Sequence, residues 1–404
     1  EYLLSNRLKF LESITAKMVK PAIQRKRISS SALDQLISLY GFSTAAGLSP
    51  TKRILSNVTP LAGGFSGTNY RIDFSDGTKF CLKICHGYDR PFVESQARVQ
   101  DHLRQSGFER ACFAIPLLLD NNDGIQSGRD DDNGDDDDDE FRFAAMDPDT
   151  GDPCLALTFL DGRAADVVIE SGAVPESIIF EEFGRALAEM HAVRLGDESR
   201  LRHFRTGGAC DVQQHVDRTL YSKMEASEYT LSHPYFTGFY PTRLAALVEG
   251  MSKSGDLPQG VLHGDPFLDN ALVDPKTGQF CGFVDFEDAT TGPLLFDVAC
   301  AVIGTCFPEG SSGFDMSRFH NLMEGYFSVR PLLRLERQLF IQFCQLTLLC
   351  NCTWRFINFN VDNREIVECR DRYRELQDRI VALEENSTTI AIEKVLDDLA
   401  KAKN

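Results

Sequence analysis

Hydrophobic and polar residues alternate in the first part of this chain and recur with helical spacing in the second. Residues 70–84 alternate on either side of an Asp76-Gly77 turn, which predicts a β-hairpin. Residues 155–160 predict another strand. Apolar positions then follow helical spacing, in a helix that ends at His191 and in a long helix near residues 332–358. The pattern predicts an α+β chain with a small β-rich first lobe and a larger helical second lobe.

Three further elements are predicted in the first lobe. Ser31 and Asp34 resemble a capping box at the start of a helix that Gly41 ends. A second helix is predicted over residues 92–106, because a glycine that can end it follows directly. The apolar residues 115–119 predict a strand.

A chain of 404 residues is longer than one core usually serves, so more than one lobe is expected. We divide it into a basic N-terminal extension at residues 1–30, a first lobe at 31–160 and a second lobe at 161–404. The extension is typical of a solvated helix, and the alternative is the remainder of an organellar transit segment. Residues 121–141 form an acidic insert that is nearly devoid of apolar side chains, so it is predicted to be disordered.

The formal net charge of −18 argues against general nucleic-acid binding, where Lys and Arg must neutralise phosphates. Residues 129–140 alone hold nine acids and one arginine. The 12 cysteines have no framework spacing, which favours reduced thiols and an intracellular, cytoplasmic location. The most apolar stretch, residues 340–352, is short and interrupted by polar side chains, so no membrane span is predicted. Neither composition nor pattern indicates an oligomeric state.

The strongest chemical signal lies between His263 and Asp285. Asp265 is followed five positions later by Asn270 and, after a predicted hairpin over residues 260–287, by Asp285. This spacing is typical of phosphoryl transfer, in which an Asp orients the acceptor hydroxyl while an Asn and a second Asp supply oxygen ligands to Mg²⁺. We therefore predict Asp265 as the catalytic base, and Asn270 and Asp285 as Mg²⁺ ligands. The alternative for Asp265 is an ordinary loop residue or a helix cap, and for Asn270 and Asp285 a surface acidic turn, but the three together favour a kinase.

A glycine-rich turn precedes the strand that carries Lys83. Backbone amides of such a turn can approach the phosphates of ATP, although most glycine-rich turns are only hairpins. We predict that Lys83 is a catalytic residue that contacts the phosphates and pairs with Glu94, because a lysine on an inward face needs a carboxylate. The alternative for Lys83 is an exposed side chain. The turn residues predicted to bind ATP are Gly63, Gly64, Ser66, Gly67 and Asn69.

The end of the last predicted strand of the first lobe is expected to connect the lobes. There, backbone groups of Thr158, Phe159 and Leu160 are predicted to meet adenine, and the alternative is a plain buried strand. His263 and Asp297 are predicted to be structural. An aspartate at the start of an apolar helix needs a partner, and the catalytic loop around Asp265 is the nearest candidate.

Two stretches, HGDPFLDN and GFVDFEDATTGPLLFDVACAV, resemble the aminoglycoside phosphotransferase and choline kinase superfamily, over roughly residues 30–380. Within it, LAGGFSGTNY, HGDPFLDNALV and CTWRFINFNV are most similar to the type II homoserine kinase branch. The resemblance implies a two-lobed, protein-kinase-like fold and the cofactors ATP and Mg²⁺. It also implies Asp265 as the base, Asn270 and Asp285 on the metal, and Lys83 on the phosphates. The first 28 residues, the acidic insert and the tail after Leu383 lie outside it.

The resemblance favours a small hydroxyl acceptor, L-homoserine, which would become O-phosphohomoserine. Its carboxylate needs an arginine and its ammonium a carboxylate, so we predict Arg355 and Asp269 for these roles. The alternatives are a structural ion pair for Arg355 and a capped turn for Asp269. Choline, ethanolamine, hydroxylysine or an aminoglycoside are other possible acceptors, and a choline type would need an aromatic cage. The cage candidates are Trp354, Phe356, Phe359, Tyr326 and Phe327. A non-catalytic binding module is a further alternative, against which the intact set of Lys83, Asp265, Asn270 and Asp285 argues.

Overall fold

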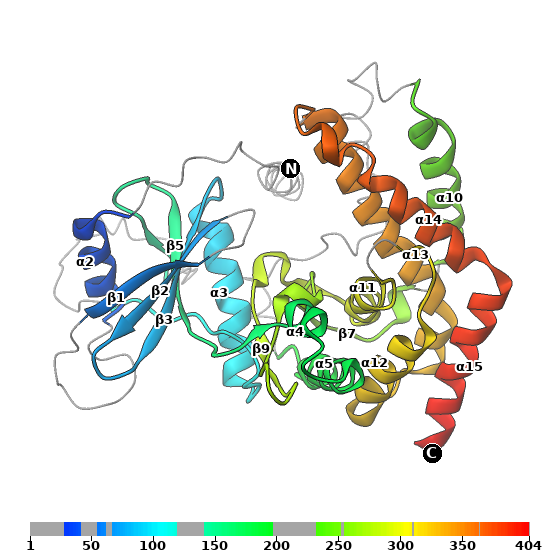
Figure 1. Ribbon diagram of the computed structural model, residues 1–404, viewed down its shortest axis with the longest axis horizontal. Coiled ribbons are helices and arrows are strands. Elements are labelled where there is room, and N and C mark those ends of the chain that lie inside the picture. The colour runs from blue at the N-terminus through cyan, green and yellow to red at the C-terminus, as the bar shows by residue number, and fades with distance from the viewer. Residues whose placement is uncertain are drawn as a thin grey trace, which may run out of the picture. The chain divides into compact units, whose positions relative to one another are not determined.

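The computed structural model describes residues 28–41, 55–61, 67–118, 141–196, 232–251, 254–308, 311–362 and 364–403. The described chain divides into two compact units. A β-rich unit contains residues 28–98 and 113–159, and a helical unit contains residues 99–112 and 160–403 (Figure 1). Of the predicted features, the basic extension up to residue 27, residues 63, 64 and 66 of the glycine-rich turn, and nearly all of the acidic insert lie outside the described residues.

The β-rich unit is built on an antiparallel five-stranded sheet with the strand order β1-β2-β3-β5-β4. The predicted hairpin is confirmed: β2 and β3 pair Tyr70 with Leu82 and Ile72 with Phe80, and Gly77 in the turn has a φ of +85°. The predicted strand that follows is also confirmed as β5, although it ends at Thr158. The strands are β1 (Leu55–Leu61), β2 (Gly67–Phe74), β3 (Lys79–Cys85), β4 (Ala145–Met146) and β5 (Pro153–Thr158).

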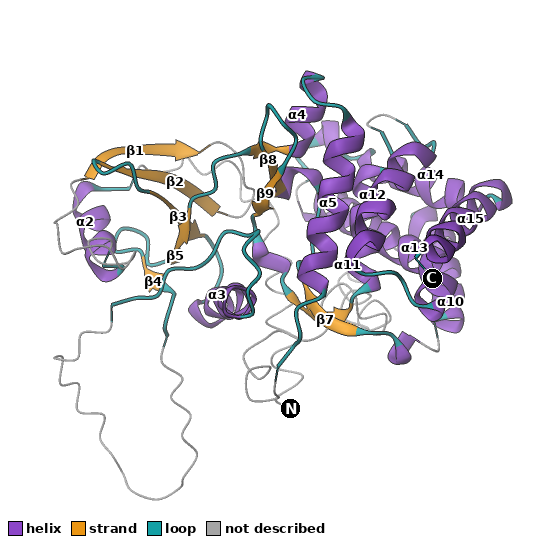
Figure 2. Cartoon of the chain, turned by 90° about the horizontal axis from the view of Figure 1, so that it is seen from below, coloured by secondary structure: helices purple, strands orange, loops and turns teal. Residues whose placement is uncertain are grey.

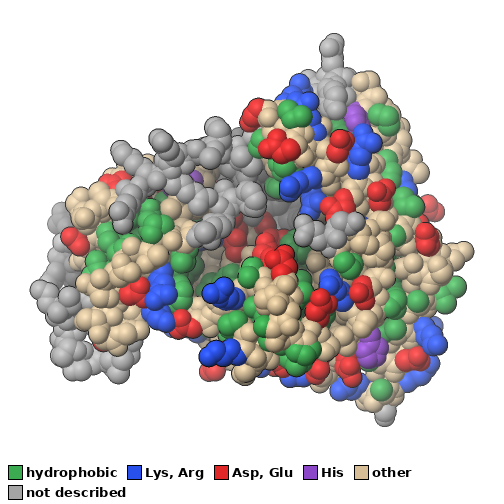
Figure 3. All heavy atoms as spheres, viewed as in Figure 1, with side chains coloured by type: hydrophobic (Ala, Val, Ile, Leu, Met, Phe, Trp, Pro, Cys, Tyr) green, Lys and Arg blue, Asp and Glu red, His purple; other side chains and the backbone are tan. Residues whose placement is uncertain are grey.

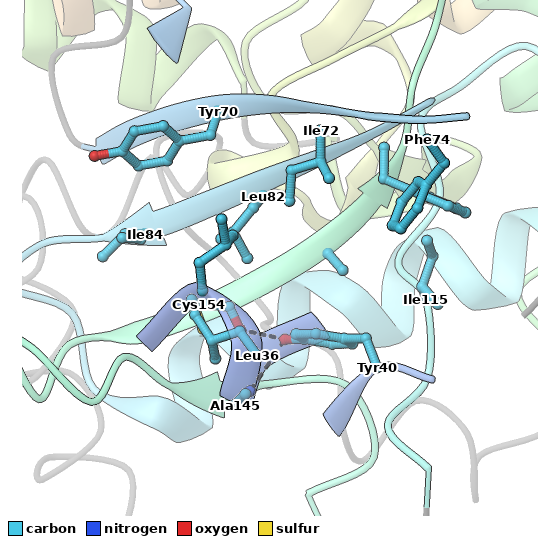
Figure 4. Close-up of a cluster of buried hydrophobic side chains, with 13 residues drawn as sticks. Leu36, Tyr40, Tyr70, Ile72, Phe74, Leu82, Ile84, Ile115, Ala145 and Cys154 are labelled. Carbon is cyan, nitrogen blue, oxygen red and sulfur yellow. Dashed lines mark hydrogen bonds between the residues drawn. The ribbon is translucent and has the colours of Figure 1, made fainter. Parts of the chain in front are cut away.

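Helix α2 (Ser30–Leu39) packs against one face of this sheet (Figure 4). Leu36 and Tyr40 enter a core with alternate side chains of β2 and β3, as amphipathic elements must to bury their apolar faces. The Tyr40 hydroxyl lies 2.9 Å from the Phe143 carbonyl and 2.8 Å from that of Cys154. The core comprises Leu33, Leu36, Tyr40, Tyr70, Ile72, Phe74, Phe80, Leu82, Ile84, Ile115, Ala145, Cys154 and Ala156.

The start of α2 corrects one prediction. The N-cap is Ser29, whose Oγ accepts the backbone N–H of Ala32 at 3.1 Å, and not Ser31 with Asp34. Asp149 accounts for the difference, because its carboxylate accepts the Ser29 backbone N–H at 2.7 Å and the Ser29 hydroxyl at 2.8 Å. A long-range contact therefore decides which serine caps the helix.

Helix α3 (Arg90–Gln105) agrees with the predicted helix, and Gly107 after it has a φ of +85°. The strand predicted over residues 115–119 is wrong for the described part, residues 115–118. After a single bridge from Ala114 to Leu157, its backbone N–H groups bond to three separate segments, at Ala156, Arg142 and Leu39. Since no one neighbour accepts them all, a regular strand does not form.

The helical unit contains two small sheets besides its helices (Figure 2). The predicted hairpin is confirmed by β8 (Ala271–Val273) and β9 (Phe280–Phe283), with β6 (Arg163–Ala164) on the other side of β8. Strand β7 (Gln259–Leu262) pairs antiparallel with β10 (Thr290–Pro293). The helices are α4 (Ala165–Ser171), α5 (Glu176–His191), α10 (Tyr240–Gly250), α11 (Leu295–Thr305), α12 (Met316–Val329), α13 (Arg334–Ile357), α14 (Arg372–Glu384) and α15 (Asn386–Ala402).

The two predicted helix positions of this unit are confirmed, since α5 ends at His191 and α13 occupies the region of the long apolar helix. Short helical turns lie at Tyr235–Phe239, Ser254–Asp256, Leu268–Asn270, Phe286–Asp288, Asn358–Asp362 and Val367–Cys369. Positive and negative side chains are interspersed over the face of this unit shown in Figure 3. None of the helices in the described ranges has both the length and the apolar character that crossing a membrane requires.

Candidate active site

The loop after β7 carries Asp265, and a glycine fixes its path. Gly264 has a φ of +86°, and a Cβ on it would lie 2.1 Å from the Asp288 carbonyl oxygen. Only glycine accommodates both the left-handed backbone and so close a neighbour. The loop that carries Asp265 is therefore packed directly against the turn that follows Asp285.

The structure brings Asp265 and Asn270 into contact. Asn270 is buried at the end of the Leu268–Asn270 turn, and its Nδ2 donates to the Asp265 carbonyl at 2.9 Å and to Asp265 Oδ2 at 3.1 Å. The Asn270 carbonyl in turn accepts the backbone N–H of Val284 at 2.9 Å. Because Val284 precedes Asp285, this bond ties both predicted metal ligands to the loop of the predicted base.

Asp285 has a strained backbone. Its φ of +62° is the only positive φ of a non-glycine residue in the described parts of the chain. Such a conformation costs roughly 1–3 kcal/mol and persists where the surroundings enforce it, commonly at functional sites. The neighbouring residues Phe283 and Phe286 are buried, and the Phe286 ring lies 4.6 Å from that of His263. These contacts hold the loop in the strained form.

His263 stabilises the same loop from inside. Its Nε2 donates to the Val284 carbonyl at 2.9 Å, so in the neutral ring Nδ1 is an acceptor, and the Asp265 backbone N–H approaches it at 3.4 Å. Burial lowers the pKa of His263, which agrees with a neutral ring. The geometry is that of a structural residue.

Asp297 is fully buried at the start of α11 and accepts two backbone N–H groups of the catalytic loop. The His263 N–H lies 2.6 Å from Oδ2, and the Gly264 N–H lies 3.0 Å from Oδ1. The loop thus provides the partners that a buried carboxylate requires. Asp297 thereby holds the backbone from which the Asp265 side chain projects.

The donor set suits magnesium. Among the described residues no group of three or more His, Cys, Asp or Glu side chains forms a metal site, so a protein-only zinc cage has no support there. Mg²⁺ differs, because it takes one or two protein oxygens and completes its octahedron with phosphate oxygens and water. Asn270 uses its amide nitrogen on Asp265, so its amide oxygen would be the atom available to a metal ion, and Asp285 would add a carboxylate.

In the β-rich unit, Lys83 lies on β3 and is only 9% exposed. Its neighbours Leu82 and Ile84 belong to the core on the opposite face of the sheet, as predicted. Gly67 of β2 pairs with Cys85, and a Cβ on it would lie 2.7 Å from the Ile84 carbonyl oxygen and 3.6 Å from Lys83 Cε, so glycine is required by close backbone approach. Asn69 pairs with Lys83 in the strand register, and its Oδ1 is buried without a hydrogen-bond partner in the described structure.

Glu94, the predicted partner of Lys83, has a set of contacts that sequence reasoning missed. Its buried carboxylate accepts three consecutive backbone N–H groups, from Arg142 at 3.0 Å, Phe143 at 2.9 Å and Ala144 at 2.8 Å. It also pairs with Arg98 at 3.3 Å. Glu94 thus anchors the segment that follows the acidic insert. No sequence signal marks such a role, because the partners are backbone groups about fifty positions away.

The predicted adenine-binding residues lie at the end of β5. The Thr158 backbone N–H donates to the Phe113 carbonyl at 2.9 Å, and its Oγ1 accepts the Phe113 N–H at 2.9 Å, so both groups are already used. Phe159 and Leu160 follow the strand. The guanidinium of Arg71 lies 5.3 Å from the centre of the Phe159 ring.

The two predicted acceptor residues have different surroundings. Asp269 lies in the turn before Asn270. Its pKa is raised mainly by partial burial, and further by the carboxylates of Asp166 and Asp285. This negative surrounding would favour a positively charged group beside Asp269. Arg355 on α13 lies 3.6 Å from Glu375 and donates to the Arg372 carbonyl at 3.4 Å, so it already has partners on α14.

The aromatic candidates for a cage do not form one group. Phe356 is buried and its ring stacks on Tyr235 at 5.2 Å, whereas Tyr326 lies inside α12 and contacts His191. Phe327 is likewise buried on α12. Of the five, Trp354 and Phe359 are partly exposed, and their rings lie 6.3 Å apart.

Comparison with known proteins agrees with this geometry. The model of the phosphotransferase enzyme family matches residues 57–332. The chain therefore belongs to the phosphotransferase enzyme family, as predicted. A homoserine kinase of Phenylobacterium zucineum (strain HLK1) is 28% identical over 187 residues, which are 46% of this chain and 52% of the relative. The chain thus spans about half the length of that curated relative in the alignment.

Two solved structures share the fold. An ethanolamine kinase of Plasmodium vivax has a TM-score of 0.54 at 11% identity and covers 93% of this chain and 98% of its own. An amicoumacin kinase, solved in complex with AMP-PNP, Ca²⁺ and Ami, has a TM-score of 0.53 at 14% identity and covers 89% and 96%. At such identities the likeness concerns the fold alone. It confirms the predicted two-lobed, protein-kinase-like α+β fold.

Proposed function

We propose that this protein is an ATP- and Mg²⁺-dependent kinase that transfers the γ-phosphate to the hydroxyl of a small molecule. The observation that carries the proposal is the joint anchoring of Asp265, Asn270 and Asp285 through the bonds from Asn270 to Asp265 and from Val284 to Asn270. Each of the three is the residue type that phosphoryl transfer needs at that place. Membership of the phosphotransferase enzyme family supports the same reaction.

In this proposal Asp265 accepts a hydrogen bond from the acceptor hydroxyl and aligns it for in-line attack. Asn270 and Asp285 hold Mg²⁺, which neutralises charge on the phosphates when it is bound. Catalysis then consists mainly of positioning and charge stabilisation, since the transferred group needs no covalent help from the protein.

For the nucleotide, we propose that Lys83 and the residues Gly63, Gly64, Ser66, Gly67 and Asn69 bind the phosphates. The buried, unpartnered Oδ1 of Asn69 supports a bound group beside Lys83, because such an atom is costly unless a donor reaches it. Glu94 steadies Lys83 in this scheme, from a helix that also anchors residues 142–144. Adenine meets the backbone of Thr158, Phe159 and Leu160, although the N–H of Thr158 already donates to the Phe113 carbonyl.

For the acceptor, we propose L-homoserine, with O-phosphohomoserine as the product. The support is the name of the curated relative and the carboxylates of Asp166, Asp269 and Asp285, which suit an ammonium group. Asp269 is the proposed ammonium ligand, and Arg355 the proposed carboxylate ligand. Arg355 would have to exchange Glu375 for the substrate, so it is the less supported of the two.

An amino alcohol without a carboxylate, such as ethanolamine or choline, is the second candidate. The same carboxylates would serve its cationic group, and no arginine would be needed. The fold likeness to an ethanolamine kinase gives no preference between these acceptors, because it concerns the fold alone. A hydroxylysine-type acceptor, like homoserine, would need an arginine for its carboxylate and a carboxylate for its ammonium group.

The test is ADP release from Mg-ATP with L-homoserine, choline, ethanolamine, hydroxylysine, an aminoglycoside or no acceptor. Asp265→Asn is the matched variant, because it keeps the shape and removes the charge. Acceptor-dependent release that Asp265→Asn abolishes would support the kinase, and the responding compound would identify the acceptor class. Release that survives Asp265→Asn at the normal rate would refute the assigned base. ATP binding without release would indicate an acceptor outside this panel, and no release together with no ATP binding would favour the non-catalytic module.

We also propose that the β-rich and helical units correspond to the predicted lobes at residues 31–160 and 161–404, with residues 1–30 as an extension. Residues 99–112 belong to the helical unit although they precede residue 160, so limited proteolysis is the appropriate test. Cleavage sites that cluster near residue 160 would support the predicted division. The predicted intracellular location also belongs to this proposal, and fractionation of cells that express the protein would test it.

A further inference from the structure

A chain of buried polar side chains extends from the catalytic loop to the start of α13. It begins at Asp297, which holds the loop, and His191 Nε2 lies 3.3 Å from the same Oδ2 that accepts the His263 N–H. On its other side, His191 Nδ1 lies 2.8 Å from the Tyr326 hydroxyl. The chain therefore joins α5 and α12 to the loop that carries Asp265.

Arg330 and Glu336 complete the chain. Arg330 donates to the Tyr326 hydroxyl at 3.0 Å and to Glu336 Oε1 at 2.8 Å. The other oxygen of Glu336 accepts the Leu333 backbone N–H at 2.8 Å, at the N-terminus of α13. Glu336 is fully buried, and its charge is compensated by Arg330. A buried carboxylate with all these partners is fixed in place.

The direction of every hydrogen bond in this chain follows from Arg330. A guanidinium only donates, so the Tyr326 oxygen is its acceptor and the Tyr326 O–H points to His191 Nδ1. Nδ1 then has no proton, and the neutral ring carries it on Nε2, where it donates to Asp297. Burial lowers the pKa of His191 and raises that of Tyr326, so both stay neutral with one proton each.

Two glycines bring the helices close enough for this contact. Helices α5 and α12 lie side by side (Figure 2). A Cβ on Gly184 of α5 would lie 2.0 Å from the Leu322 carbonyl oxygen, and one on Gly325 of α12 would lie 2.0 Å from the Glu181 carbonyl oxygen. Backbones this close admit only glycine. The residue after Gly325 is Tyr326, so the glycine contact places the hydroxyl beside His191.

We propose that Tyr326 and Arg330 are positioning residues of the phosphoryl transfer: they fix the His191 tautomer that donates to Asp297 and thereby hold the His263-Gly264 backbone from which Asp265 projects. The proposal rests on the proposed function for its kinetic part. Without the Tyr326 hydroxyl, His191 Nδ1 is left buried with no donor, and the ring loses the contact that holds its Nε2–H toward the Asp297 carboxylate. Asp297 then loses a donor, and the loop gains freedom.

The decisive variant is Tyr326→Phe, which removes one oxygen and keeps the ring. We expect kcat to fall about tenfold, within the range that a small misplacement of reacting groups produces, while KM for ATP stays nearly unchanged. Arg330→Lys should lower kcat in the same direction, because one ammonium cannot replace the fork that reaches both Tyr326 and Glu336. Tyr40→Phe is the matched control, since its hydroxyl is also buried and bonded but lies in the β-rich unit.

A second readout does not depend on activity. Hydrogen–deuterium exchange of a peptide containing residues 263–265 reports the two N–H groups that Asp297 accepts. We expect faster exchange there in Tyr326→Phe and Arg330→Lys, with no change in Tyr40→Phe. Unchanged exchange and unchanged kcat in a folded Tyr326→Phe protein would overturn the proposal, as would a fall in kcat matched by Tyr40→Phe. Faster exchange in a protein that transfers no phosphate to any acceptor would support the positioning chain and refute the proposed function instead.

Discussion

Replacing Glu94 by Gln tests the contacts that the structure assigns to this residue. The two oxygens of Glu94 accept different donors. Oε2 accepts the N–H groups of Phe143 and Ala144, and Oε1 accepts the N–H of Arg142 and pairs with Arg98. Gln keeps one oxygen, which will accept the N–H groups of Phe143 and Ala144. Its amide NH₂ must then face Arg142 and Arg98, both donors.

The cost of Glu94→Gln can be worked out from these contacts. Leaving the partly buried Arg142 N–H without an acceptor costs about 1 kcal/mol, the low end for such a loss, and the two remaining bonds lose the strengthening effect of a charged acceptor, worth about 0.5–1 kcal/mol each. Arg98 is partly exposed, so its ion pair adds no more than about 1 kcal/mol. We expect a loss of about 3 kcal/mol in the free energy of unfolding.

Urea unfolding of the full chain, together with hydrogen–deuterium exchange of residues 141–146, measures this effect. Glu109→Gln is the control, because Glu109 is an exposed glutamate in the loop that follows α3. If Glu94→Gln unfolds within about 0.5 kcal/mol of the wild type and its exchange is unchanged, the reasoning is refuted. A loss of ADP release with unchanged stability would instead indicate that Glu94 acts only by pairing with Lys83.

Three other predictions concern backbone strain, helix packing and pH. The Asp285→Gly variant should be more stable than Asp285→Ala by about 1 kcal/mol, because the left-handed φ at this position strains Ala but not Gly. Calorimetry of the two variants measures the difference. Gly184→Ala should destabilise the chain by about 3 kcal/mol in urea unfolding, since the new methyl meets the Leu322 carbonyl in the backbone of α12; Gly238→Ala, with open space around it, is the control. Burial lowers the pKa of His191, so below the unfolded pKa of 6.5 the unfolded chain binds a proton there that the folded chain does not. The contribution of His191 to the free energy of unfolding should therefore be constant above pH 6.5 and fall below it by up to about 1.4 kcal/mol per pH unit. His191→Gln should reduce this slope in urea unfolding followed against pH.

The amino-acid sequence predicted the elements whose pattern is local. The β2–β3 hairpin follows from strict alternation around Asp76-Gly77, and α13 from a long apolar stripe. Each element forms its backbone hydrogen bonds within itself, and its buried residues recur along the sequence at the spacing of a strand or a helix. The spacing of Asp265, Asn270 and Asp285 predicted phosphoryl transfer in the same way, since a hairpin is short enough to bring its ends together without knowledge of the fold. The family was predicted from the resemblance of two motifs, and the family model confirms it.

Elements that depend on distant partners were predicted poorly. Ser29 caps α2 because Asp149 binds it from another segment, and residues 115–118 fail to form a strand because their N–H groups find three different acceptors. Neither feature has a local signature. Propensity and capping patterns act within a few residues, whereas these outcomes depend on which backbone groups a folded chain presents.

By itself the sequence determined the alternation, the helical periods, the glycines and the order of the catalytic side chains, because these are properties of neighbouring residues. Only the tertiary structure decided that Asp285 takes a left-handed backbone, that Glu94 accepts three amides of a distant segment, and that His191 reaches both Asp297 and Tyr326. The reason is that a buried charge or N–H must find a partner wherever the packed chain places one, and packing joins residues that lie more than a hundred positions apart.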